Sequence, residues 1–82
     1  MPSDKQLLDC LEKMAGRKSK DEGELHLCWL VEESLAGQYI IDYSYSLESL
    51  TFTGNHHDFY LAHATWQQRT IALAQTLGIE IV

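Results

Sequence analysis

Proline is nearly absent from this chain: Pro2 is the single one in a sequence of 82 residues. Long apolar runs are absent too, and none approaches the ~18 residues that a membrane-spanning helix requires. The opening stretch MPSDKQLLDCLEK has early acidic residues and no continuous apolar segment, so it does not resemble a secretory signal. We expect residues 1–82 to form a single cytoplasmic domain that does not enter a membrane.

Cysteine is scarce as well: the chain has only Cys10 and Cys28, which are not spaced as a CxxC pair. Two cysteines are too few for a disulfide framework, so we expect both to be small buried apolar side chains. The phosphate-binding motifs GxxxxGK and GxGxxG and the nucleophile motif GxSxG are also missing. The sequence therefore predicts no cofactor, and it gives no positive sign of catalysis.

Basic residues are few and unevenly placed. The formal net charge is −6, and five of the six lysines and arginines precede residue 25. Residues 25–82 contain Arg69 alone, against the acidic residues Glu32, Glu33, Asp42, Glu48, Asp58 and Glu80. Because lysine and arginine provide the phosphate contacts of nucleic-acid binding, direct binding of DNA or RNA is not expected. An acidic body favours a protein partner with a basic surface.

What the chain does contain is the composition of a globular protein, with 45% hydrophobic and 22% charged residues. The clearest early element is a helix that Ser3 or Asp4 caps and Gly16 ends. Its apolar residues fall on one helical stripe: Leu7, Leu8, Leu11, Met14 and Ala15.

The segment 19–37 fits either a helix or a strand. Ser19 and Glu22 have the spacing of a capping box, and Gly37 would close the far end of a helix. One helical stripe would consist of Leu27, Cys28, Val31 and Leu35. A strand would alternate through Leu25, Leu27, Trp29 and Val31. A helix is favoured slightly, because the ending ESLAG is typical of one.

Strand-like alternation follows. The residues that alternate with polar neighbours are Tyr39, Ile41, Tyr43 and Tyr45, and residues 50–53 would form a second short strand. A long helix is predicted from Asn55 to Leu77, with Gly78 after it, and residues 79–82 would add a terminal strand. The expected fold is α+β: two N-terminal helices, the second of which could be a strand, a short antiparallel sheet, a long C-terminal helix and a short terminal strand.

Three of the four histidines lie in GNHHDFYLAHATWQQR, where a metal or acid–base site must be considered. Neighbouring residues on a helix diverge by roughly 100°, so His56 and His57 do not converge. His56 and His63 share a face but lie ~10 Å apart along the axis, too far for one zinc ion. We therefore expect no metal, and we interpret Asp58 as a favourable charge in the first turn of a helix.

A second face of the predicted long helix would carry Tyr60, Ala64 and Ile71, with Leu61 nearby. Because aromatic side chains are favoured at interfaces, these residues are the predicted partner-binding surface. The function expected is that of a small acidic protein-binding module, such as an inhibitor, adaptor or immunity-type protein, that occludes a partner without catalysis. A homodimeric structural or regulatory protein is the alternative. A small enzyme using His56, His57 and Asp58 comes third.

Overall fold

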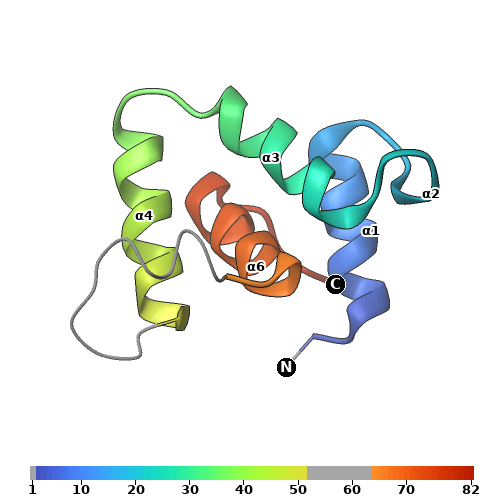
Figure 1. The fold of residues 1–82 in the computed structure, drawn as a ribbon. Helices are drawn as coiled ribbons and strands as arrows, with labels where there is room; N and C mark the ends of the chain where they lie inside the picture. Colours follow the sequence, from blue (N-terminus) through green and yellow to red (C-terminus); the bar gives the residue numbers. More distant parts are fainter. Residues whose placement is uncertain (1, 52–63) are drawn as a thin grey trace.

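The computed structural model describes residues 2–51 and 64–82, and the regular elements within them are all α-helices (Figure 1). They are α1 (Asp4–Ala15), α2 (Ser19–Glu22), α3 (Glu24–Ser34), α4 (Gln38–Thr51) and α6 (Trp66–Leu77). The described part of the chain contains no strand. The expected α+β fold with an antiparallel sheet is therefore wrong.

The predicted first helix is confirmed as α1. Ser3 is its N-cap: the Gln6 backbone N–H donates to the Ser3 hydroxyl at 3.2 Å, and the Ser3 N–H donates to the Gln6 side chain at 2.8 Å. Gly16 follows the helix with φ 71, a left-handed conformation that glycine adopts without steric cost. The helix buries Leu7, Cys10 and Leu11.

The ambiguous segment forms two helices rather than one. Ser19 belongs to the four-residue helix α2, whose N-cap is Lys18, so the predicted capping role of Ser19 is wrong. The Ser19 backbone N–H donates instead to the Glu12 carboxylate at 2.8 Å. Gly23, with φ 83, separates α2 from α3, and the helical interpretation of 24–34 is correct.

The two predicted strands between Tyr39 and Thr53 are contradicted, because Gln38–Thr51 is the single helix α4; residues 52 and 53 lie outside the described residues. In a helix, Tyr43 and Leu47 lie one turn apart, and both are buried. Strand preference reflects the fit of side chains to a half-buried surface, and it spans only ~1 kcal/mol. Packing against α6 outweighs it.

The last helix starts later than predicted. Trp66 is its first residue, and Thr65 is the N-cap in a capping box with Gln68. The two cap hydrogen bonds measure 2.9 and 3.1 Å. The predicted helical turns at 55–63 lie outside the described residues. The predicted end is confirmed, since Gly78 adopts a left-handed φ of 70.

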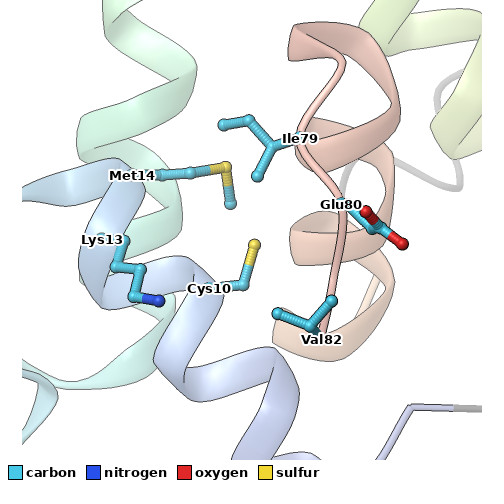
Figure 2. Close-up of a pocket in the computed structure, with 6 residues that line it drawn as sticks. All are labelled: Cys10, Lys13, Met14, Ile79, Glu80 and Val82. Carbon is cyan, nitrogen blue, oxygen red and sulfur yellow. The ribbon is translucent and has the colours of Figure 1, made fainter.

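Residues 79–82 do not form the predicted terminal strand. The Ile79 N–H donates to the Ala74 carbonyl at 2.9 Å, which completes the C-terminal cap of α6. The residues after it then run beside α1 (Figure 2).

Helix α6 lies at the centre of the fold, with α4 on one side, α1 on the other and α3 across them (Figure 1). Burial therefore extends around much of α6: Arg69, Thr70, Ala72, Leu73 and Ala74 are all buried. Trp66 is partly buried against the same core. Each surrounding helix contributes a fully buried leucine, namely Leu11, Leu27 and Leu47.

Candidate functional site

The residues predicted to bind a partner do not form one described helical face. Ala64 precedes α6 and is only 8% exposed, within the hydrophobic core. Ile71 lies on α6 and is half-buried. Tyr60 and Leu61 lie outside the described residues, as do His56, His57, Asp58 and His63. The binding role predicted for Tyr60, Leu61, Ala64 and Ile71 stays a prediction.

Large exposed apolar side chains occur instead on α4. Ile41 is 48% exposed and Tyr45 is 68% exposed. These two residues are one helical turn apart, so their side chains are neighbours on one face. That face points away from the core, because Tyr43 and Leu47 occupy the inward side of the helix. Tyr39 and Ile40, at the start of α4, are also about half exposed.

Acidic residues flank this apolar pair. At roughly 100° per residue, Asp42 falls beyond Tyr45 and Glu48 falls on the other side, next to Ile41. Asp42 accepts a hydrogen bond from the Gln38 side-chain amide at 3.1 Å, a contact along the surface of the helix. We call Ile41, Asp42, Tyr45 and Glu48 the α4 outer face.

Helix α3 has a similar apolar pair on its solvent side. Leu25 and Trp29 are exposed and lie one turn apart. The His26 ring meets the Trp29 indole edge to face, with centroids 6.5 Å apart and an interplanar angle of 77°. This contact orients the indole, and aromatic pairs with this geometry contribute ~0.5–1.5 kcal/mol beyond their buried area.

A buried polar cluster holds α4 in its position. The Arg69 guanidinium of α6 donates to the Glu32 carboxylate of α3 at 2.7 Å, and the Tyr43 hydroxyl of α4 donates to the same carboxylate oxygen. Arg69 Nε also donates to the Ala64 carbonyl at 3.3 Å. Three helices thus meet at one carboxylate, and the inward side of α4 is fixed relative to α3 and α6.

The electrostatics of this cluster keep its groups in one protonation state. Burial and the hydrogen bond to Glu32 raise the pKa of Tyr43 well above its ordinary value, so the phenol stays neutral. Burial alone would lower the pKa of Arg69, but the adjacent Glu32 carboxylate raises it, so the guanidinium stays charged. The cluster is suited to a structural role rather than to proton transfer.

Arg69 also determines the charge of the surface. It is the one lysine or arginine in residues 25–82, and it is only 7% exposed. The exposed charged side chains of the described α3–α4 region include Glu33 and Asp42, and no lysine or arginine is present there to balance them. The α4 outer face therefore lies in a negative electrostatic environment.

A small cavity lies between α1 and the C-terminal residues (Figure 2). Its volume is about 130 Å³, and Cys10, Met14, Ile79 and Val82 line it. Figure 2 shows the Cys10 sulfur and the Met14 side chain directed toward the C-terminal segment. Burial raises the pKa of the Cys10 thiol, which keeps it protonated and weakly nucleophilic. The rest of the lining is Lys13 and Glu80, whose charged side chains lie at the edge of a mainly apolar cavity.

Both cysteines are free and buried, as the sequence predicts. Within residues 2–51 and 64–82 no three histidine, cysteine or acidic side chains lie together as metal ligands would. Three of the four histidines lie outside those ranges, so the expectation of no metal stays a prediction.

The α4 outer face was not predicted from the sequence, because a strand would place Tyr43 on the same face as Ile41 and Tyr45. The signal that separates them is the four-residue spacing of Tyr43 and Leu47 followed by Leu50, which is a helical stripe. Once that stripe faces the core, Ile41 and Tyr45 must face outward.

No helix in the described residues is long and apolar enough to cross a membrane. A comparison with known proteins finds no family model, no curated protein and no solved structure that matches this chain.

Proposed function

We propose that this chain is a small acidic protein-binding module, an inhibitor, adaptor or immunity-type protein, that acts in the cytoplasm. It occludes a surface of its partner and catalyses no reaction. The observation that carries the proposal is the α4 outer face, where Ile41 and Tyr45 remain exposed beside Asp42 and Glu48.

The energetics of these two side chains support a contact surface. Fully burying a large apolar side chain gains about 1.5–3 kcal/mol, and Ile41 and Tyr45 leave a large part of that gain unused in the isolated chain. Tyrosine is also enriched among the residues that dominate protein interfaces. Single exposed apolar residues are common on protein surfaces, so the support comes from the adjacent pair and not from either residue alone.

The rigid attachment of α4 supports the same conclusion. Tyr43 hydrogen-bonds to Glu32, and Leu47 is fully buried, so the inner side of the helix is anchored at two successive turns. A face held in place before binding loses less conformational entropy when a partner covers it.

Site-specific photo-cross-linking in the native cell tests the proposal. A photoreactive phenylalanine analogue replaces Tyr45, and in a control chain it replaces Lys5, an exposed position on α1. We expect position 45 to form one discrete heavier product containing another protein, and position 5 to form none. The cross-linked protein is then identified and purified for binding measurements.

The control and the alternative give distinct results. A product from position 45 that contains two copies of this chain would favour the homodimeric alternative. Equal, diffuse labelling from positions 45 and 5 would show that the α4 outer face is ordinary surface, and the proposal would fail.

A further inference from the structure

The α4 outer face has the shape of a convex helical ridge. Helix α4 has 14 residues, so it is roughly 21 Å long, and its inward side packs on α6. Ile41 and Tyr45 form one row along the i to i+4 direction, the kind of row that fits into the grooves of another helix. The described residues contain no strand, so they provide no sheet edge to which an extended peptide could add.

The charges beside this ridge specify the flanks of a partner. Asp42 and Glu48 lie on opposite sides of the apolar row, and Glu33 is exposed at the end of α3. Residues 25–82 have no exposed lysine or arginine, because Arg69 is buried against Glu32. A covering element with its own acidic flanks would meet repulsion on both sides, whereas lysine or arginine flanks would be attracted.

These charges also argue against a second copy as the occupant. A two-fold contact through α4 uses the same patch on both chains, so it brings Asp42 and Glu48 toward the same acidic residues of the other chain. The lysines and arginines of this chain precede residue 25, apart from the buried Arg69. A two-fold α4–α4 contact therefore brings acidic flanks together, and residues 25–82 provide no exposed lysine or arginine to face them.

We infer that the α4 outer face binds a basic amphipathic α-helix, supplied by a protein partner and lying along α4. An apolar row of that helix covers Ile41 and Tyr45, and lysine or arginine residues beside the row face Asp42 and Glu48. This inference rests on the proposed function, since it names the chemistry of the partner for the same surface.

A designed peptide provides the probe. It has about 18 residues, enough for a helix of roughly 27 Å, with leucines on one face, lysines on both flanks and alanines elsewhere. One comparison peptide carries glutamates in place of the lysines. Another contains the same residues as the basic peptide in an order that destroys the apolar row. Isothermal calorimetry measures affinity, and amide chemical shifts of the labelled protein locate the contact.

The basic amphipathic peptide should bind at least about tenfold more tightly than either comparison peptide, and the largest shifts should lie in α4. If the basic peptide binds more tightly than the scrambled peptide, the apolar row is needed for binding. If it binds more tightly than the acidic peptide, the positive charge of its flanks is needed. Circular dichroism should show the bound peptide becoming helical.

Variants of the protein localise the effect. Ile41→Ser with Tyr45→Ser should weaken binding of the basic peptide at least about tenfold, because both anchors lose their apolar surface. Asp42→Asn with Glu48→Gln should slow association several-fold and change dissociation less. Val82→Ser, which removes an exposed apolar side chain away from α4, is the matched control and should bind within about twofold of wild type. Thermal melts confirm that each variant is folded.

Equal affinity for the basic and scrambled peptides, or shifts outside α4, would overturn the inference. Self-association that Ile41→Ser with Tyr45→Ser abolishes would also overturn it, because the occupant would be a second copy. If none of the peptides binds but position 45 still cross-links to a protein, the partner does not present a basic helix, and the proposed protein-binding function still holds. If the peptides do not bind and position 45 does not cross-link to a protein, both the inferred basic helix and the proposed function are wrong.

Discussion

Arg69 shows how one residue serves both the core and the surface of this chain. In the sequence it is the lone lysine or arginine after residue 24, and nothing in its spacing indicates whether it is exposed. In the structure its guanidinium joins Glu32, and its burial leaves the exterior of that part acidic. The acidic character could be predicted from composition. The pairing could not, because Glu32 is 37 residues away in the chain.

Replacement of Arg69 by Met should destabilise the fold by about 3 kcal/mol, because the loss of one partner leaves Glu32 and Tyr43 without their cation. Arg17→Met is the matched control: Arg17 pairs with Glu22 at 2.8 Å, but its side chain is 57% exposed. That change should cost no more than about 1 kcal/mol. Urea unfolding followed by circular dichroism measures both. Similar costs for the two variants would contradict the structural role given to Arg69.

Cys28 makes stability sensitive to alkaline pH. Burial raises the pKa of its thiol from 9.0 to about 11, and the Thr70 hydroxyl, in contact with the sulfur at 3.7 Å, opposes this shift. The pKa of Cys28 is higher in the folded chain than in the unfolded chain. The stability that the protonated thiol contributes is therefore fully present below pH 9 and is lost as pH rises toward 11. Its loss is roughly 2 kcal/mol.

Free energies of unfolding, measured from pH 8 upward, test this prediction. Cys28→Ala lowers stability at every pH because it removes buried atoms, but it should flatten the decline above pH 9. The comparison of slopes excludes the contribution of tyrosine ionisation, which both proteins share. Parallel curves for wild type and variant would show that the buried thiol is not the cause.

At the scale of elements, three helix ends could be predicted from the sequence. Ser3, Gly16 and Gly78 act as the sequence indicated, because caps depend on local chemistry. The capping box of Thr65 and Gln68 was equally visible in TWQQ, and it marks the true start of α6. Asn55 was predicted as the start of this helix instead, because asparagine is also a favoured N-cap residue.

Helix α4 was mispredicted for a physical reason. Its aromatic and β-branched residues alternate with polar ones over one short stretch, a pattern typical of a half-buried strand. The choice between strand and helix depends on what lies opposite, and here α6 presents a surface that Tyr43 and Leu47 cover. Nothing local to Gln38–Thr51 contains that information.

Two substitutions distinguish a helix from a strand at α4. In a strand, Tyr45 and Leu47 would share a face, whereas in the helix Leu47 is fully buried and Tyr45 is exposed. Leu47→Ala should therefore cost about 2–5 kcal/mol, and Tyr45→Ala should change stability by about 0.5 kcal/mol or less. Chemical denaturation measures both. Comparable costs for the two would mean that the orientation of α4 is wrong.

At the scale of the whole molecule, the sequence indicated a small acidic chain but not its architecture. The predicted sheet would have left one side of the last helix open to a partner. With α6 enclosed by α1, α3 and α4, most of the large exposed apolar side chains of the described residues lie on α3 and α4. Ala64, which was predicted to lie on the partner-binding surface, lies in the hydrophobic core beside α6.

The isolated chain should be monomeric, with a mass of 9.4 kDa, because acidic residues flank the apolar row on α4. Sedimentation equilibrium over a wide concentration range measures this mass. A dimer that persists on dilution would instead support the homodimeric alternative.

The most direct test of a protein-binding α4 outer face is the affinity of the partner recovered by cross-linking. Calorimetry with that purified partner should show at least about tenfold weaker binding by the folded Ile41→Ser, Tyr45→Ser variant than by wild type, since both anchors are lost. Val82→Ser should bind as wild type does. Unchanged affinity in the double variant would contradict partner binding by the α4 outer face, because the partner would then be held by another part of the chain.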